Sequence, residues 1–331
     1  MTETSDSQHV EDMAPPALSQ SEPSRADAAL TATPDSAFPA WLKALPDFIQ
    51  PYAALARLDR PVGIWLLLLP CWMGLLHVRI PTGLRPIDAF WCILFAVGAV
   101  VMRGAGCTWN DISDRAIDAK VARTASRPIP SGAVSLHEAY IFLLAQLGVG
   151  LLVWLCLPGD AKTVALFALP LVAAYPFMKR LTWWPQAWLG FTFNFGVLIG
   201  AATAASITGA NVVLYLGLVL WTVAYDTIYA LQDTEDDALL GVKSTARLFQ
   251  NKVLTGIFIF HLGATALIFF ALAFAEAERV GAFLGLLFLG HGLGQISRLK
   301  ASQNGEALAV FKSNVWLGAL VVMGFLLAAL L

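Results

Sequence analysis

The sequence has little charge and few of the residues that build most soluble catalytic sites. Charged residues make up 13% of the 331 residues, and a net charge of -2 leaves no basic surplus for binding nucleic acid. The five histidines are scattered, and the four cysteines lack a paired C-x-x-C spacing. The cysteines are therefore expected to be buried free thiols, and no zinc or haem site is predicted.

Hydrophobic sequence takes the place of charge. Hydrophobic residues make up 58% of the chain, the mean hydropathy is +0.68, and apolar runs of about twenty residues recur. This composition excludes a soluble globular protein and predicts an all-α polytopic membrane protein with nine transmembrane helices around a central cavity. The expected spans are 62–78, 87–108, 136–157, 161–178, 186–208, 211–231, 253–276, 279–297 and 313–331.

The first 40 residues differ from the rest. They are acidic and rich in Ser, Ala, Pro and Thr, which predicts a disordered tail before a single transmembrane domain over 41–331. The tail has neither the apolar core of a secretory signal nor the Arg-rich character of a mitochondrial transit peptide, which favours a bacterial inner membrane. Residues 41–60 predict one amphipathic helix at the membrane interface.

Lysine and arginine are distributed unevenly across the predicted spans. Only Arg79, Arg85, Lys162 and Arg279 fall on one side, and the other cations of the transmembrane domain gather on the opposite side. The positive-inside rule then places the N-terminus in the cytoplasm and, with an odd number of spans, Leu331 outside.

Two acidic clusters stand out in this apolar chain. Their members are Asn110, Asp111, Asp114 and Asp118 in the first, and Asp226, Asp233, Asp236 and Asp237 in the second. The main carboxylates of each set are spaced to share one helix face. Because adjacent like charges repel, the pattern indicates a strongly cationic ligand such as Mg²⁺ with a bound phosphate.

The clusters follow the second and the sixth predicted spans. That spacing predicts a duplicated four-helix unit, with halves at about 61–185 and 186–312 and a final helix at 313–331. The loops between spans two and three and between spans six and seven would then form a cytoplasmic cap, and the two clusters would face each other over the cavity.

Facing carboxylates suit diphosphate chemistry. Asp111, Asp114, Asp118, Asp233 and Asp237 are the candidate catalytic metal ligands, which would hold Mg²⁺ against a departing diphosphate. The same side supplies donors for the diphosphate in Arg60, Arg103, Lys179, Arg180 and Lys243. Arg103 lies seven residues before Asn110, and Asp226 lies seven residues before Asp233, so a polar ladder would descend from each loop into the membrane. Lipid at the flank suits a long isoprenoid tail.

The motifs resemble those of a known family. The stretch from Asn110 to Asp118, continuing to Arg127-Pro-Ile-Pro-Ser-Gly132, closely resembles the first signature of the UbiA-type prenyltransferases. The stretch from Asp226 to Asp237, followed by Gly241-Val-Lys243-Ser-Thr-Ala246, resembles the second. Tyr175-Pro-Phe-Met-Lys179-Arg180 and Arg57-Leu-Asp-Arg60-Pro-Val-Gly63 are similar to further family segments, and the resemblance covers about 50–331.

The resemblance is strongest to members that act on 4-hydroxybenzoate. It implies transfer, dependent on Mg²⁺, of a polyprenyl group from polyprenyl diphosphate to the ring carbon ortho to the hydroxyl, in ubiquinone biosynthesis. Carried over by position, Asn110, Asp111, Asp114 and Asp118 would bind metal and diphosphate, and Asp233 and Asp237 would be the matching carboxylates. Arg103 could face either the diphosphate or the carboxylate of the acceptor.

Two alternatives remain open at this level. A family relative could prenylate another acceptor, such as dihydroxynaphthoate, homogentisate, a chlorin or haem. A cation-coupled transporter would also use membrane carboxylates, but it predicts ionisable residues near the middle of interrupted spans. Here the carboxylates gather at the helix ends, which favours capture of a charged diphosphate at the membrane surface.

Overall fold

The structure, a computed structural model, describes residues 39–121, 124–239 and 241–331, apart from the side chain of Asp236. The predicted tail lies almost entirely outside these residues. Within the described ranges, nine helices are long and apolar enough to cross a membrane, which confirms the predicted number of spans. They are α4 (Val62–Arg79), α5 (Pro86–Asp118), α6 (Leu136–Cys156), α7 (Gly159–Leu181), α8 (Pro185–Ala204), α9 (Gly209–Ala230), α12 (Val253–Ala273), α13 (Glu278–Ala301) and α14 (Ala307–Leu330).

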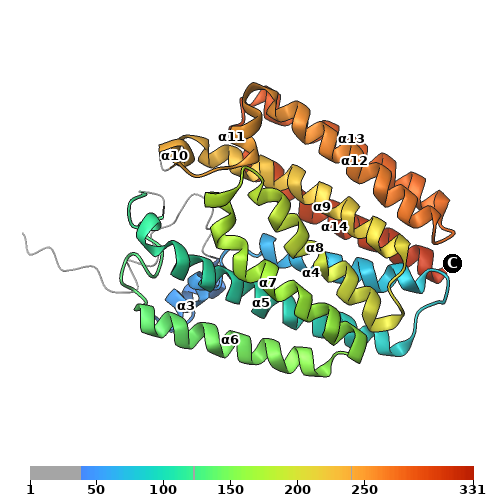
Figure 1. Cartoon of the computed structure of the whole chain (residues 1–331), viewed down its shortest axis with the longest axis horizontal. Helices are drawn as coiled ribbons and strands as arrows, with labels where there is room; N and C mark the ends of the chain where they lie inside the picture. The colour runs from blue at the N-terminus through green and yellow to red at the C-terminus, as the bar shows by residue number, and fades with distance from the viewer. Residues whose placement is uncertain (1–38, 122–123, 240) are drawn as a thin grey trace, which may run out of the picture.

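Figure 1 shows the long helices side by side along the long axis of the molecule. The short helices α3 (Gln50–Leu55), α10 (Thr234–Leu239) and α11 (Thr245–Phe249) all lie toward the same end of the bundle, which we call the cap end. The C-terminus lies at the other end. Both acidic clusters therefore belong to the same end of the bundle.

Helix α5 carries the whole first cluster. It begins with Pro86 at its first position, where the Asp88 carboxylate accepts a hydrogen bond from the Arg85 backbone N–H at 2.7 Å. It then runs for 33 residues to Asp118, ten residues beyond the predicted end of the span. The predicted apolar span ends at 108, and the helix continues through the carboxylates because cations from other elements pair with them.

The second cluster lies on a less regular segment. Helix α9 ends at Ala230, a 3₁₀ turn covers Leu231–Asp233, and α10 begins at Thr234. Asp233 and Asp237 therefore sit on different elements, not on one α-helix as predicted. Gly241, with φ +69°, follows α10 in the left-handed region that commonly ends a helix.

The segment before the first span was predicted as a single amphipathic helix over 41–60. It forms two short helices instead, α2 (Ala40–Lys43) and α3, because Pro46 lies between them and cannot continue a hydrogen-bonded helix. Trp41 and Phe48 are exposed, which suits contact with a membrane surface, whereas Leu42 is buried.

Close packing of α4 against α8 forms the centre of the bundle. A Cβ added to Gly74 would come within 2.8 Å of the Cα of Val197, and one added to Gly200 would meet the backbone at Cys71. Glycine is needed here because it lets the two backbones approach closely. These are the first helices of the two predicted halves; the duplication itself stays a prediction.

At the end of the bundle away from the cap, a buried ion pair joins α4 to α5. The Arg79 guanidinium donates to both oxygens of Asp88, at distances of 2.7 to 3.1 Å. Both side chains are buried. Asp88 lies 30 residues before Asp118 on the same helix, about 45 Å away along its axis, so this pair cannot touch the acidic clusters.

Candidate active site

A cavity of about 240 Å³ opens at the cap end. Its walls come from the ends of α5, α7 and α9, the start of α8 and the segments that follow α5 and α9. The predicted site residues that line it are Asn110, Asp118, Lys179, Asp226, Asp233, Asp237 and Lys243. Residues from both acidic clusters, more than 100 positions apart in the chain, thus face one space.

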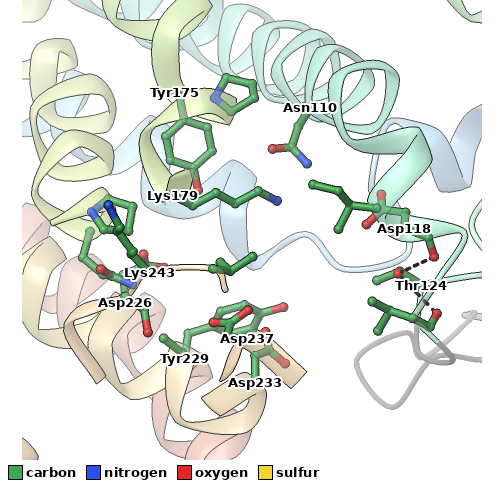
Figure 2. Close-up of a pocket in the computed structure, with 18 of the residues that line it drawn as sticks. Asn110, Asp118, Thr124, Tyr175, Lys179, Asp226, Tyr229, Asp233, Asp237 and Lys243 are labelled. Atoms are coloured by element: carbon green, nitrogen blue, oxygen red, sulfur yellow. Dashed lines mark hydrogen bonds between the residues drawn. The ribbon is translucent and has the colours of Figure 1, made fainter. Parts of the chain in front are cut away.

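Figure 2 shows how these side chains are arranged. Asn110 and Asp118 project from the α5 side, and Asp226, Tyr229, Asp233 and Asp237 come from the opposite side. Tyr175 and Lys179 of α7 lie between the two groups. The cavity therefore has two acidic walls with a lysine between them.

Asp114 lies behind the first wall and is fully buried. Lys179 forms an ion pair with one of its oxygens, and Arg180 donates to the other at 2.8 Å. Arg180 is exposed and also lies 6.0 Å from the ring of Phe177. Asp114 thus joins the end of α5 to the end of α7.

Asp111 is also fully buried, and two arginines hold it. Arg57, from the turn between α3 and α4, donates to both of its oxygens at 2.8 Å. Arg127, from the segment after α5, lies 3.3 Å from one of those oxygens and 2.7 Å from Asp118. Burial alone would lower the pKa of Arg57, but the negative groups beside it, Asp111 first, raise the pKa overall, so Arg57 stays charged.

The negative charge of the first cluster is therefore offset by cationic side chains of the protein itself. Three buried or nearly buried carboxylates face four cations, namely Arg57, Arg127, Lys179 and Arg180. A cluster of carboxylates can be buried only when such partners offset its desolvation and mutual repulsion. This pairing explains why the acidic motif folds as a continuous helix.

The predicted polar ladder is present below the cavity. Arg103 lies on α5, and its guanidinium stands 5.3 Å from the ring of Phe193. Among the residues that the structure describes, its buried Nε has no hydrogen-bond partner. Arg103 attracts Asp226 electrostatically, and a Cβ on Gly63 would come within 2.8 Å of the guanidinium carbon. Gly63 therefore leaves the space that the arginine occupies.

The two remaining predicted donors to the diphosphate, Arg60 and Lys243, make other contacts in the structure. Arg60 pairs with its neighbour Asp59 at 2.9 Å and does not belong to the cavity lining. Lys243 lines the cavity, but its ammonium also donates to the Leu181 carbonyl at 3.2 Å. That bond anchors the segment after α10 to the end of α7.

Sequence reasoning missed several residues at this site. Arg127, Thr124, Gln186 and Ser244 line the cavity, and Arg57 holds Asp111 from behind it. For Arg127 the signal was its place in the Arg-Pro-Ile-Pro segment after the first cluster. For Arg57 the signal was its place in the family-like segment from Arg57 to Gly63, but no local pattern predicted its pairing with Asp111, which lies 54 residues away.

The donor set fits magnesium. The wall residues offer carboxylate and amide oxygens, the ligands that Mg²⁺ prefers. Across the described side chains, no three His, Cys, Asp or Glu groups already converge on one metal position. Proteins usually bind Mg²⁺ through one or two carboxylates together with substrate phosphates.

The chain is similar to known proteins over most of its length. The family model described as "UbiA prenyltransferase family" matches residues 61–329. The 4-hydroxybenzoate polyprenyltransferase, mitochondrial, of Bos taurus is 42% identical over 288 residues, which are 85% of this chain and 76% of that protein. The protein of the same name from Homo sapiens is 39% identical over 327 residues, covering 97% of this chain and 85% of its own.

Solved structures share the fold. A UbiA homolog from Aeropyrum pernix K1, in its apo form, superposes with a TM-score of 0.67 at 26% identity, covering 78% of this chain and 96% of its own. A UbiA homolog from Archaeoglobus fulgidus bound to GPP and Mg²⁺ gives a TM-score of 0.65 at 18% identity, over 85% of this chain and 100% of its own. With nine spans in its described residues, its paired acidic motifs and the family match over most of its length, this chain belongs to the UbiA prenyltransferase family.

Proposed function

We propose that this chain transfers a polyprenyl group from polyprenyl diphosphate to 4-hydroxybenzoate, at the ring carbon ortho to the hydroxyl, in ubiquinone biosynthesis. Relatives that carry this activity in their names are about 40% identical over most of the chain. The structural observation that carries the proposal is the pair of acidic walls facing one cavity at the end of an apolar helical bundle.

The cavity walls would bind the diphosphate. Asp118 on one wall and Asp233 and Asp237 on the other would hold Mg²⁺, with Asn110 beside them. When bound, Mg²⁺ supplies positive charge that stabilises the departing diphosphate. Lys179, Arg127 and Lys243 line the same space and would donate to the phosphate oxygens. Metal contact by Asp111 and Asp114 stays a prediction; in this structure both are held by cations.

The acceptor would lie deeper. Arg103 is two helical turns, about 10 Å, further into the bundle than Asn110, and its buried Nε has no partner. A buried, unsatisfied guanidinium N–H is costly unless an acceptor reaches it. We propose that Arg103 binds the carboxylate of 4-hydroxybenzoate and that the residues at the cap end bind the diphosphate.

The residues then support an electrophilic aromatic substitution. The bond between the allylic carbon and the diphosphate oxygen breaks, and the electron pair leaves with the diphosphate. The ring carbon ortho to the phenol oxygen bonds to the allylic cation and afterwards gives its proton to a base, which restores the aromatic ring. Tyr175 and Tyr229 line the cavity, where their rings would exclude water and face the cation. Holding both substrates in one cavity replaces an improbable encounter in solution.

We also propose that the chain lies in a bacterial inner membrane with its cap end in the cytoplasm. The uneven distribution of lysine and arginine supports this orientation. Cys156, contrary to the expectation that the cysteines are buried, is exposed and ends α6 away from the cap. A membrane-impermeant thiol reagent should label it from outside intact spheroplasts. Labelling only after the cytoplasmic face is opened would reverse the orientation.

The activity can be tested with the purified protein in lipid vesicles. Supplied with Mg²⁺, a polyprenyl diphosphate and 4-hydroxybenzoate, it should yield the prenylated acid, detected by mass. Dihydroxynaphthoate and homogentisate serve as competing acceptors, and preference for either would reassign the substrate. Mg²⁺-dependent cation uptake into sealed vesicles without any prenylated product would support the transporter alternative.

A further inference from the structure

A chain of four charged side chains connects the turn between α3 and α4 to the cavity. Arg57 holds Asp111 through both carboxylate oxygens, Asp111 contacts Arg127, and Arg127 forms an ion pair with Asp118. Asp118 and Arg127 line the cavity, whereas Arg57 and Asp111 do not. The chain thus has two members inside the site and two behind it.

We propose, on the basis of the function assigned above, that Arg57 and Asp111 form a positioning pair that holds Arg127 in place for the diphosphate. In this assignment Asp111 acts through Arg127 and does not itself bind the metal. Arg127 would exchange its contact with Asp118 for a diphosphate oxygen when Mg²⁺ binds the Asp118 carboxylate. Its second contact, with Asp111, keeps it in the cavity wall during that exchange.

The burial of Asp111 supports this division of roles. Its side chain is 0% exposed, and a guanidinium already occupies both of its oxygens. To bind a metal in the cavity, Asp111 would have to break two charge-assisted hydrogen bonds and leave Arg57 buried without its partner, which is strongly unfavourable. Asp118 on the same helix faces the cavity, and its ion pair with Arg127 involves one carboxylate oxygen.

The backbone conformation of Arg57 also supports a role for its side chain. Helix α3 ends in a Schellman motif, in which Leu58 N–H donates to Ala53 O and Arg57 N–H donates to Ala54 O, each at 3.0 Å. Arg57 occupies the position that usually belongs to glycine, and its φ is +58°. A residue with a Cβ is strained there. An arginine at this position therefore indicates that its side chain is needed.

The chain contains a matched control for this pair. Arg79 and Asp88 also form a buried pair in which one guanidinium contacts both carboxylate oxygens. That pair joins α4 and α5 at the end away from the cap. Replacing either arginine removes a buried ion pair, but only Arg57 is connected to the cavity. The comparison separates a loss of positioning from a general loss of stability.

The experiment measures binding of inorganic diphosphate with Mg²⁺, by calorimetry, to the full chain in detergent. Arg57→Gln should weaken diphosphate binding by about 10- to 100-fold, the usual effect of removing a residue that orients a ligand-binding group. Asp111→Asn should weaken it as much, and the double variant no more than either single variant, because both changes release the same arginine. Arg57→Lys should give a smaller loss.

Arg79→Gln should lower the melting temperature but leave diphosphate binding within about twofold of the parent chain, since its pair does not reach the site. Equal binding losses in the Arg57→Gln and Arg79→Gln variants would reduce Arg57 to a structural role. Abolished Mg²⁺ binding in Asp111→Asn with little change in Arg57→Gln would make Asp111 a direct ligand. If Arg57→Gln does not fold, unchanged binding by the folded Arg57→Lys variant overturns the proposal.

The same variants give a kinetic readout with both substrates. The KM for polyprenyl diphosphate should rise, whereas the KM for 4-hydroxybenzoate should not change, because Arg103 is not connected to this chain of charges. Failure of the parent chain to prenylate any acceptor would refute the proposed function, but the diphosphate-binding comparison would still decide the role of Arg57.

Discussion

The two acidic motifs contain the same kinds of residues but are built differently. The first lies on the last turns of one continuous helix, and its carboxylates are buried and paired with cations from three other segments. The second is divided between a 3₁₀ turn and a short helix, and Asp233 and Asp237 are only half-buried at the cavity wall. Similar sequence patterns thus produce one preorganised wall and one more accessible wall.

The difference suggests a division of labour. A carboxylate that already holds an arginine or a lysine contributes order, because those cations remain in place before the substrate arrives. A carboxylate at the surface of the cavity can change its partners at lower cost. We infer that the first motif positions the cationic side chains and that the second motif does more of the direct metal binding.

Removing the metal should have the largest effect on activity. Chelation of divalent ions with EDTA is expected to abolish prenyl transfer completely, because no charge would then stabilise the departing diphosphate. The melting temperature should fall by less than about 2 °C, below roughly 1 kcal/mol of stability, since the first motif is neutralised by its own cations. A large fall in melting temperature would contradict the contrast between the motifs.

Replacing a carboxylate of the second motif should have the second largest effect on activity. Asp237→Ala is expected to lower kcat by about 10³-fold, the scale of losing a group that stabilises transition-state charge. Its melting temperature should stay near that of the parent chain, because Asp237 is only half-buried. Turnover and thermal unfolding measured on the same preparation test both statements, and wild-type turnover would remove Asp237 from the site.

The matching change in the first motif should affect folding as well. Asp114→Ala leaves Lys179 and Arg180 without their shared partner. Because both cations are partly exposed, we expect a loss of about 2 kcal/mol of stability, less than for a fully buried pair. Activity should also fall, since Lys179 lines the cavity. An unchanged melting temperature would mean that the pairing does not stabilise this wall.

A change beside Arg103, deeper in the bundle than the two motifs, should have a smaller effect on activity. Gly63→Ala should displace the guanidinium of Arg103 and raise the KM for 4-hydroxybenzoate by about tenfold, roughly 1.4 kcal/mol. The KM for the diphosphate should stay unchanged. Gly106→Ala is the control, because a Cβ there meets nothing within 4 Å. Similar kinetics in both variants would argue against Arg103 as the acceptor-binding residue.

Local sequence patterns predicted much of this architecture. Hydropathy was sufficient for the nine spans, and the i, i+3, i+7 spacing placed the first motif on one helix face. The hydropathy pattern did not reveal where α5 ends. The carboxylates that end its hydrophobic run are stabilised by cations from other segments, so the helix continues to Asp118. The pattern also did not show that the segment before the first span forms two helices. Nor did it show that on α2 the side chain of Trp41 is exposed while that of Leu42 is buried.

The sequence by itself determined the class of protein, the number of spans and the residue types available for binding magnesium and diphosphate, because these depend on composition and on short periodicities. Only the tertiary structure decided which carboxylate faces the cavity and which is held behind it. Asp118 and Asp111 belong to the same motif, yet the first lines the cavity and the second binds Arg57 from 54 residues away. The physical reason is that pairing of buried charges depends on distances between helices, which no local pattern contains.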